Sequence, residues 1–304
     1  MSTIAVGTLL WAVLVDATVG EPPRRLHPVA LLGSWIAAVD AHYTRPMIMG
    51  TGILLTGTAG FIGVYASVGV VAQQLPTGVT ILLMGTALST LLSLRMLTDV
   101  ADSVAVSIES DIARAREDVR ALVGRDVSRA GPGELRSAVL ESLAENLSDG
   151  FVSTVLAFSI GALVSPTVGL AAAAMVKAVN TFDSMLGYEH RRVGTPSARM
   201  DDVLQWLPAR LTALLLAVTA GRLGLLFDRR LQTTARRPAS PNSGWPMATF
   251  AAVSGVKLHK RGAYRLDPPG ATVAPAAASV SPAIARIRRT AGLMVLLCGV
   301  LLWL

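Results

Sequence analysis

The chain has 304 residues, of which 52% are hydrophobic and only 15% are charged, and its mean hydropathy is +0.54. This composition is typical of an integral membrane protein rather than a soluble domain, and the single cysteine excludes an internal disulfide or a cysteine-ligated metal cluster. The net charge is +7. The basic residues lie mostly between apolar runs and lack interleaved aromatic residues, so they predict cytoplasmic loops and no nucleic-acid partner.

Apolar runs predict an all-α, polytopic bundle of about five to six membrane segments within one membrane domain, residues 1–304. The predicted membrane segments are residues 4–15, 47–71, 77–100, 151–179, 203–227 and 290–304. Residues 47–71 and 77–100 are the clearest, since about 1.5 Å of rise per residue lets each cross a hydrocarbon core of about 30 Å. A short amphipathic helix is predicted at residues 29–42.

Two long connections are predicted to be cytoplasmic. Residues 100–150 form a soluble-like helical loop with a break at Gly131-Pro132-Gly133, and residues 228–289 form the most basic connection. The excess of Lys and Arg in cytoplasmic loops places the basic connection inside the cell. The sequence therefore predicts a multi-pass protein of the cytoplasmic membrane, surrounded by the lipid bilayer.

The apolar segment 151–179 is interrupted by Ser165-Pro166-Thr167, which leaves two topologies open. As one kinked span, it would place residues 183–202 on the side of the membrane opposite to the neighbouring polar loops. As a helical hairpin, it would keep all the polar loops on one side.

A polar stripe lies at the end of this apolar segment. Helical spacing places Lys177, Asn180, Asp183, Ser184 and Gly187 on one face of a helix. Polar groups in a membrane segment cost free energy unless they are paired, bound to a ligand or facing a cavity, so this stripe predicts a functional site. The alternative is a purely structural helix end whose charged side chains reach the lipid interface, which would account for Lys177 but not for the other polar residues.

Three carboxylates follow one another at steps of four residues in a predicted helix over residues 134–150: Glu141, Glu145 and Asp149. Like charges at this spacing repel each other, and a bound Mg²⁺ or ammonium group would stabilise them. A solvated acidic face fits the same pattern equally well.

Residues 191–202 predict a shaped loop that binds anions and a metal. Arg199 can bind phosphate or carboxylate through its planar fork, and the adjacent Asp201 and Asp202 are typical metal ligands. The alternative is a charged loop at the membrane surface, which the density of Gly, Pro and Ser disfavours.

The stretch Ser240-Pro-Asn242-Ser-Gly244-Trp-Pro predicts a helix start, whose free N–H groups form an anion site. As structure alone it is a well-capped helix, and the nearby arginines favour phosphate binding. Prolines hold His27 in an extended setting in the first polar loop. The sequence has no P-loop and no G-x-S-x-G motif.

Taken together and in order, these motifs resemble the CobD/CbiB family, the adenosylcobinamide-phosphate synthases of cobalamin biosynthesis. The blocks that carry the resemblance are His27-Pro28-Val29 with Gly33, Glu141-Ser142-Leu-Ala-Glu145-Asn146 with Asp149-Gly150, Asn180-Thr-Phe-Asp183-Ser184-Met-Leu-Gly187-Tyr188, Ser197-Ala-Arg199-Met-Asp201-Asp202 with Pro208-Ala-Arg210, and Ser240-Pro-Asn242-Ser-Gly244-Trp245-Pro. One departure is visible: the family pattern has a Gly-rich turn before the tyrosine, whereas this chain has His259-Lys260-Arg261-Gly262-Ala263-Tyr264.

The resemblance implies a membrane ligase that joins adenosylcobyric acid to (R)-1-amino-2-propanol or its O-phosphate, with ATP as co-substrate and Mg²⁺ as cofactor. Whether the amine is free or phosphorylated stays open, as does self-association into a homo-oligomer. The alternative is a membrane transporter or permease for a corrinoid, which the position of the distinctive residues at helix ends and in loops disfavours. A scaffold for a pathway complex is a third interpretation.

For this chemistry we assign hypothetical roles. The predicted catalytic residues are His27, as general base, with Lys177, Asn180, Asp183 and Glu145. The predicted substrate- and phosphate-binding residues are Ser184, Tyr188, Arg199, Arg210, Ser240, Asn242 and Gly244. The predicted metal ligands are Glu141, Glu145, Asp149, Asp201 and Asp202. Because ATP is cytoplasmic, the motifs should converge on the cytoplasmic face, which favours a hairpin that turns near Pro166.

Overall fold

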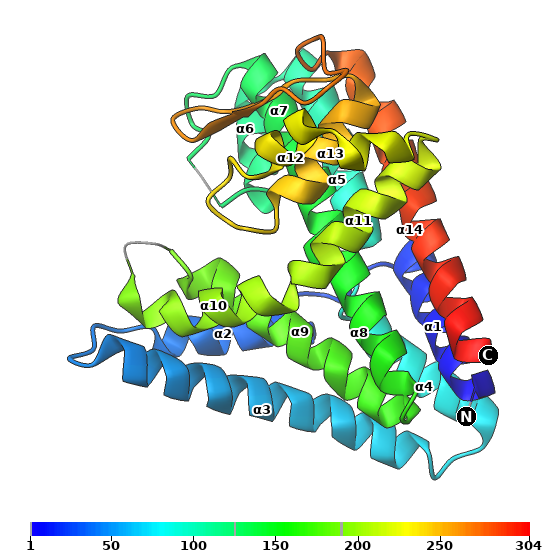
Figure 1. Cartoon of the computed structure of the whole chain (residues 1–304). Helices are drawn as coiled ribbons and strands as arrows, with labels where there is room; N and C mark the ends of the chain where they lie inside the picture. Colours follow the sequence, from blue (N-terminus) through cyan, green and yellow to red (C-terminus); the bar gives the residue numbers. More distant parts are fainter. Residues whose placement is uncertain (1, 125, 189–190) are drawn as a thin grey trace. The chain divides into compact units, whose positions relative to one another are not determined.

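The computed structural model describes residues 2–124, 126–188 and 191–304 and is nearly all α-helical (Figure 1). The chain divides into two compact units. The first unit comprises residues 1–93, 150–205 and 295–304, and the second comprises residues 94–149 and 206–294. The sequence analysis predicted a single membrane domain over residues 1–304. Whether the two units form one domain is not tested here, so that stays a prediction.

Helix α9 (Pro166–Leu186) is the centre of the first unit. It begins with two local signals: Ser165 Oγ accepts a hydrogen bond from the Val168 N–H at 3.2 Å, and Pro166 occupies the first turn. The helices packed against it are α2 (Pro28–Val39), α3 (Pro46–Ala72), α4 (Thr77–Ser89), α8 (Ser153–Ala162) and α10 (Thr195–Leu204). Helix α1 (Ser2–Thr18) packs on α4.

The predicted break near Pro166 is confirmed. Helix α8 ends at Ala162, and α9 packs back against it after a short turn. The two helices approach closely because of glycines: a Cβ at Gly169 would lie 2.6 Å from the carbonyl oxygen of Phe158. The segment is therefore a helical hairpin and not a single kinked helix.

The predicted segment 77–100 is not one continuous helix. Helix α4 ends at Ser89, and α5 (Leu94–Ser110) begins after a break. The Ser89 and Thr90 hydroxyls donate to the carbonyls of Thr86 and Ala87 at 2.8 and 2.7 Å. Such hydrogen bonds compete with the helical ladder and bend helices, which the high hydropathy of the segment conceals.

The predicted segment 203–227 is also wrong, because its residues belong to several elements. Helix α10 ends at Leu204, and α11 (Trp206–Thr219) and a 3₁₀ turn, η4 (Leu223–Phe227), follow. Pro208 has no N–H to donate to the Leu204 carbonyl, so α10 cannot continue in register. Gly221 adopts a φ of +65° just after α11 ends.

The predicted loop at residues 191–202 is mostly helical. A short 3₁₀ turn, η3 (Arg192–Gly194), leads directly into α10. Pro196 lies in the first turn of α10, where its missing N–H has no helical partner to lose. The Gly and Pro residues that suggested a loop therefore mark a helix start.

Helix α13 (Gly244–Ser254) is the centre of the second unit, and it is buried on nearly all sides. The elements packed against it are α7 (Pro132–Asn146), α11, α12 (Arg229–Ala235), η4 and strand β2 (Tyr264–Leu266). Helix α5 packs against α6 (Ile112–Asp118), η1 (Val119–Ala121) and α7. The start of α7 directly after Gly131 confirms the predicted break there.

A small β-hairpin is the exception to the all-α prediction. Strand β1 (Leu258–Lys260) pairs antiparallel with β2, and Gly262 turns the chain with a φ of +75°. A 3₁₀ turn, η5 (Ala277–Ser279), precedes α14 (Val280–Trp303), which begins well before the predicted terminal segment 290–304.

Among the described residues, one helix is long and apolar enough to cross a membrane: α3, with 27 residues and a mean hydropathy of 1.7 in its most apolar stretch. Counting α4 and α5 as one broken span would add a second. Only 33% of that stretch of α3 is buried, so the helix exposes much apolar surface. Core helices of soluble proteins can match this length and composition, so the support for a membrane location is weak, and the number of spans stays a prediction.

Two glycines of α3 provide a matched test of this packing. A Cβ at Gly50 would lie 2.0 Å from the Val193 carbonyl oxygen, whereas a Cβ at Gly52 would have nothing within 4 Å. We expect Gly50→Ala to destabilise the protein by about 2–4 kcal/mol, because the clash is with backbone. Gly52→Ala should be neutral or stabilising by up to about 1 kcal/mol. Thermal unfolding of both variants in one detergent measures the difference, and equal unfolding temperatures would contradict the packing of α3 on η3.

Candidate functional site

Acidic and amide side chains meet where the C-terminal part of α9 packs against α10. The Asn180 Nδ2 donates to Asp201 Oδ1 at 3.4 Å. Asp183 and Asp202 lie close enough for their charges to act on their acidic neighbours. Arg199 lies 3.8 Å from Asp202, but its side chain is 81% exposed, so this ion pair contributes little. We call Asn180, Asp183, Asp201 and Asp202 the acid cluster.

Ionisation of the acid cluster is unfavourable. Asp201 is 8% exposed, and burial, followed by the charge of Asp183, raises its pKa to about 7 against the opposing effect of the Asn180 and Gln205 amides. Burial, followed by the charge of Asp202, raises the pKa of Asp183 to about 6. Dehydrated carboxylates that repel one another are stabilised by a cation, so the acid cluster suits a metal ion or an ammonium group.

Close backbone contacts fix the end of α9 beside the acid cluster. The Gly187 N–H donates to the Asp183 carbonyl at 2.7 Å, and a Cβ at Gly187 would lie 1.9 Å from Asp183 Oδ1. A Cβ at Gly194 would lie 1.7 Å from the Leu186 carbonyl oxygen. Glycine is therefore required on both sides of this junction.

Gln205 belongs to this site, although the sequence analysis did not identify it. Its side chain is 1% exposed, and its amide lowers the pKa of Asp201. Neither of its polar atoms reaches a partner with normal hydrogen-bond geometry within the described residues. Gln205 follows Asp201 by four residues, and this spacing is the signal that could have identified it.

Three further predicted site residues lie on α9 or just after it. Lys177 is half-buried, one turn before Asn180. Ser184 is exposed, and its Oγ donates to the Thr181 carbonyl at 2.9 Å. Tyr188 follows the helix and is 44% exposed. Their predicted roles stay predictions.

His27 begins α2 and is 8% exposed. Its Nδ1 accepts a hydrogen bond from the Val29 N–H at 3.2 Å, and its Nε2 lies 3.5 Å from Glu21 Oε2. Both ring nitrogens therefore have a partner within the described residues. The predicted role of His27 as a general base stays a prediction.

Glu141 has a different environment in the second unit. It is 4% exposed, and its two carboxylate oxygens accept hydrogen bonds from Ser137 Oγ at 2.9 Å and from the Tyr264 hydroxyl at 3.2 Å. Ser137 Oγ in turn accepts a hydrogen bond from the His259 N–H at 2.6 Å. This Glu141 network attaches the β-hairpin to α7, which explains the buried carboxylate without a metal.

The predicted helical face of three carboxylates is interrupted. Helix α7 ends at Asn146, and residues 147–152 form a π-helical turn that contains Asp149. The wider turn shifts Asp149 out of step with Glu141 and Glu145, both of which are in α7. Within the described residues, no three His, Cys, Asp or Glu side chains are grouped as a metal site.

Arg210 holds the stretch that precedes α13. Its guanidinium donates to Asn242 Oδ1 and, at 3.1 Å, to the Pro241 carbonyl, and it lies over the rings of Trp206 and Trp245 at 4.8 and 5.3 Å. Ser240 Oγ accepts from the N–H groups of Asn242 and Ser243, and a Cβ at Gly244 would lie 1.9 Å from the Ala235 carbonyl oxygen. Helix α13 begins at Gly244, which confirms the predicted helix start, and Pro246 is its third residue. Phosphate binding by these residues stays a prediction.

A family model described as CobD/Cbib protein matches residues 9–294 of the chain. A probable cobalamin biosynthesis protein CobD from Methanothermobacter thermautotrophicus is 35% identical over 270 residues, which cover 87% of each protein. The chain belongs to the CobD/CbiB family. The cobalamin biosynthesis protein CobD of Klebsiella pneumoniae is 35% identical over 82% of this chain and 81% of its own length, and the protein CbiB of Salmonella arizonae is 33% identical over 88% and 86%. No solved structure matches the chain.

The predicted site residues of this CobD/CbiB protein fall into two sets. Those in the first unit are His27, Lys177, Asn180, Asp183, Ser184, Tyr188, Arg199, Asp201 and Asp202. Those in the second unit are Glu141, Glu145, Asp149, Arg210, Ser240, Asn242 and Gly244. The structure brings Asn180, Asp183, Asp201 and Asp202 together, and it uses Glu141, Arg210 and Asn242 in contacts that hold loops to helices.

The acid cluster predicts an unusual dependence of stability on pH. The folded-state pKa of Asp201, raised to about 7, lies above an unfolded value of about 3.9, so the folded protein loses stability as pH rises between these values. Asp201→Asn removes this loss, and we expect it to stabilise the protein at pH 8 by about 1–3 kcal/mol, with the gain disappearing towards pH 4. Thermal unfolding of both proteins across this range measures the effect.

Asp202→Asn is the control, because Asp202 is less buried and Arg199 acts against the rise in its pKa. Its gain at pH 8 should be smaller. A gain for Asp201→Asn that is the same at pH 4 and pH 8 would show that the carboxyl of Asp201 is not the source.

Proposed function

We propose that the protein is an ATP-dependent acid–amine ligase of cobalamin biosynthesis. It would join adenosylcobyric acid to (R)-1-amino-2-propanol or its O-phosphate and form adenosylcobinamide or adenosylcobinamide phosphate. Family membership supports the pathway, since the curated relatives are named cobalamin biosynthesis proteins. The observation that carries the reaction class is the acid cluster, in which a buried carboxylate, Asp201, lies beside the partly buried Asp183 and Asp202, an arrangement that suits a cation.

Amide formation from a carboxylate needs activation at neutral pH. Transfer of the ATP γ-phosphoryl group to the propionate forms an acyl phosphate and ADP. Attack of the neutral amine on the acyl carbon then forms the C–N bond, breaks the C–O bond and releases inorganic phosphate. The amine must lose a proton before or during the attack, so a carboxylate beside the ammonium group is useful.

The acid cluster fits two cations of this reaction. Its carboxylates would hold Mg²⁺, which neutralises charge on phosphate oxygens; Mg²⁺ needs few protein ligands because it keeps water and phosphate ligands. Asp183 and Asn180 would orient the ammonium group of the amino alcohol, because an amide and a carboxylate together fix the direction of an N–H donor. Asp183, with its raised pKa of about 6, is the group best placed to take a proton.

Cationic side chains would stabilise the phosphoryl group during transfer. Lys177 and Arg199 are the candidates in the first unit, and Arg210 is the candidate in the second. Glu145 and Asp149 remain candidate acids, whereas the closed hydrogen bonding of Glu141 argues for a structural role. Ser184, Tyr188, Ser240, Asn242 and Gly244 remain candidates for substrate contacts.

We also propose that the enzyme is a multi-pass protein of the cytoplasmic membrane with its site on the cytoplasmic face. Support comes from the exposed apolar surface of α3 and from the α8–α9 hairpin. If both helices of the hairpin enter the membrane, the chain would leave it on the side from which it entered, as the proposal requires. ATP is available only in the cytoplasm.

Substitution in the acid cluster should abolish ligation. The assay follows the amide product by mass spectrometry, with detergent-purified protein, adenosylcobyric acid, ATP, Mg²⁺ and either form of aminopropanol. We expect Asp183→Asn and Asp201→Asn to lower turnover by about a hundredfold or more, since each removes a charge that is poised to bind a cation. Asp102→Asn, an exposed carboxylate of α5, should behave like the wild type.

Two results of this assay would overturn the proposal. If folded Asp183→Asn and Asp201→Asn turned over at the wild-type rate, the acid cluster would have no role in the reaction. If wild-type protein gave no product with either amine form, the protein would not be this ligase.

The membrane orientation has its own test. The native Cys298 is buried, so an introduced cysteine reports with little background. Arg192, the residue to be replaced by cysteine, is exposed and lies in η3, which packs against α9 and α10. We expect an impermeant maleimide to label it in inverted vesicles and not in intact cells, with wild-type protein as the unlabelled control. Labelling in intact cells would place the site on the outer face.

A further inference from the structure

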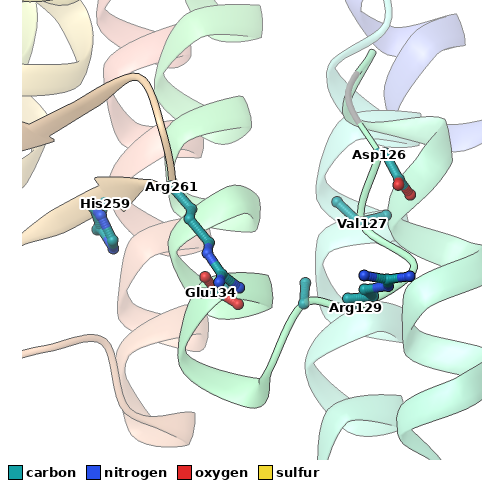
Figure 2. A pocket seen from close by; sticks show the side chains of 7 residues that line it. Asp126, Val127, Arg129, Glu134, His259 and Arg261 are labelled. Carbon is teal, nitrogen blue, oxygen red and sulfur yellow. The ribbon is translucent and has the colours of Figure 1, made fainter.

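A small pocket of about 120 Å³, with five charged or imidazole side chains among its lining residues, lies in the second unit, apart from every predicted site residue. Three segments line it: the loop 126–130, the first turn of α7 and the β-hairpin at His259 and Arg261. Figure 2 shows the Arg261 side chain extending from the hairpin toward Glu134 in α7, with Asp126 and Arg129 across from it. The pocket is partly open to solvent, so a phosphate group can reach it from the surface.

The acids of this pocket are already used by the backbone. Asp126 Oδ1 accepts a hydrogen bond from the Ser128 N–H at 2.9 Å, and Glu134 Oε2 accepts from the Gly131 N–H at 3.0 Å. These are local turn and helix-capping contacts. They account for why carboxylates lie in the pocket without assigning them a ligand.

The bases of this pocket are not used in the same way. Arg129, His259 and Arg261 are exposed, and among the described residues none of these side chains forms an ion pair or a hydrogen bond through its guanidinium or imidazole. The pKa of Asp126 is lowered first by its hydrogen bond from Ser128 and also by the charge of Arg129, so Arg129 still acts on this carboxylate at longer range. The first turn of α7, a helix of 15 residues, adds a partial positive charge. The unused hydrogen-bonding capacity of the pocket is therefore that of donors.

The hairpin that carries His259 and Arg261 has a fixed position. The His259 N–H is bonded to Ser137 Oγ, and the Tyr264 hydroxyl is bonded to Glu141, so both strands are attached to α7. The Lys260↔Tyr264 pair closes the hairpin immediately before and after the turn. The donors are consequently held by the same helix whose first turn lines the pocket, which reduces the entropy lost when an anion binds.

We propose that this pocket binds a phosphate group, with the forks of Arg129 and Arg261 and the imidazole of His259 as the donors. The fork of an arginine can donate to two phosphate oxygens at once. In the part of the chain that the structure describes, no carboxylate accepts hydrogen bonds from the forks of Arg129 and Arg261. The existence of the site does not depend on the proposed ligase reaction. Only the identity of the ligand rests on it, since ATP and aminopropanol phosphate are the phosphorylated substrates of that reaction.

Calorimetric titration of the full-length protein in detergent, at fixed ionic strength, tests the proposal. The probes are inorganic phosphate, ATP and aminopropanol phosphate, each added separately. We expect Arg129→Gln and Arg261→Gln to weaken at least one of these affinities by about tenfold, the usual loss for a charge-assisted hydrogen bond. Arg261→Lys, which keeps the charge but loses the fork, should weaken it less.

The matched control is Arg265→Gln, an exposed residue of the same hairpin that pairs with Asp267 at 3.8 Å and does not line the pocket. It changes the net charge equally and should leave every affinity unchanged. A loss confined to ATP would identify a nucleotide phosphate as the ligand, and a loss confined to aminopropanol phosphate would identify the amino alcohol. Equal weakening in all the Gln variants, or no binding of any probe to the wild type, would overturn the proposal.

Failure of this proposal and failure of the ligase proposal are distinguishable. The titration measures binding and does not require that an amide forms. If the protein binds phosphate through Arg129 and Arg261 but yields no product, the phosphate-site proposal stands and the ligase proposal fails. If the protein forms the amide but its affinities are unchanged by both substitutions, the ligase proposal stands and the phosphate-site proposal fails.

Discussion

The burial of Asp201 beside Asp183 is the interaction on which the rest of the first unit depends. Burial and the neighbouring negative charge both oppose ionisation, so the fold must hold these side chains together against a free-energy cost. Close approaches of three glycines surround this junction. Gly187 and Gly194 fix the end of α9, and Gly50 brings α3 against Val193. A Cβ at Gly50 or Gly194 would clash with the backbone of a neighbouring segment, and a Cβ at Gly187 would clash with Asp183 itself. The packing of the unit and the position of the carboxylates are therefore linked.

Two buried acids in this chain, Glu141 and Asp201, have different hydrogen-bonding environments. Both oxygens of Glu141 accept hydrogen bonds from Ser137 and Tyr264, and its burial stabilises the attachment of the hairpin. Asp201 has a long hydrogen bond from Asn180 and a buried amide, Gln205, without good geometry. A satisfied group needs no ligand, whereas an unsatisfied one gains stability when a ligand arrives. This difference could not be read from the sequence, where both acids appeared as candidate metal ligands.

Local signals in the sequence predicted the elements they control, and tertiary contacts decided the others. The turn before Pro166 was predictable because Ser165 and the proline define a helix start by themselves. The break after Ser89 was missed because hydropathy does not register hydroxyl groups that bond to carbonyls. Residues 191–202 were misread because Pro196 is as compatible with a first helical turn as with a loop. The pairing of Asn180 with Asp201 required the packing of α9 on α10, which no spacing within either segment reveals.

The two polar sites have opposite electrostatic preferences. The carboxylates of the acid cluster are suited to a cation, whereas the pocket of Arg129, His259 and Arg261 is suited to an anion. The two sets of charges are held by different elements. The carboxylates depend on glycine contacts around α9, whereas His259 and Arg261 depend on the hairpin attached to α7, and Arg129 lies in the loop 126–130. Each can therefore be altered without changing the packing that supports the other.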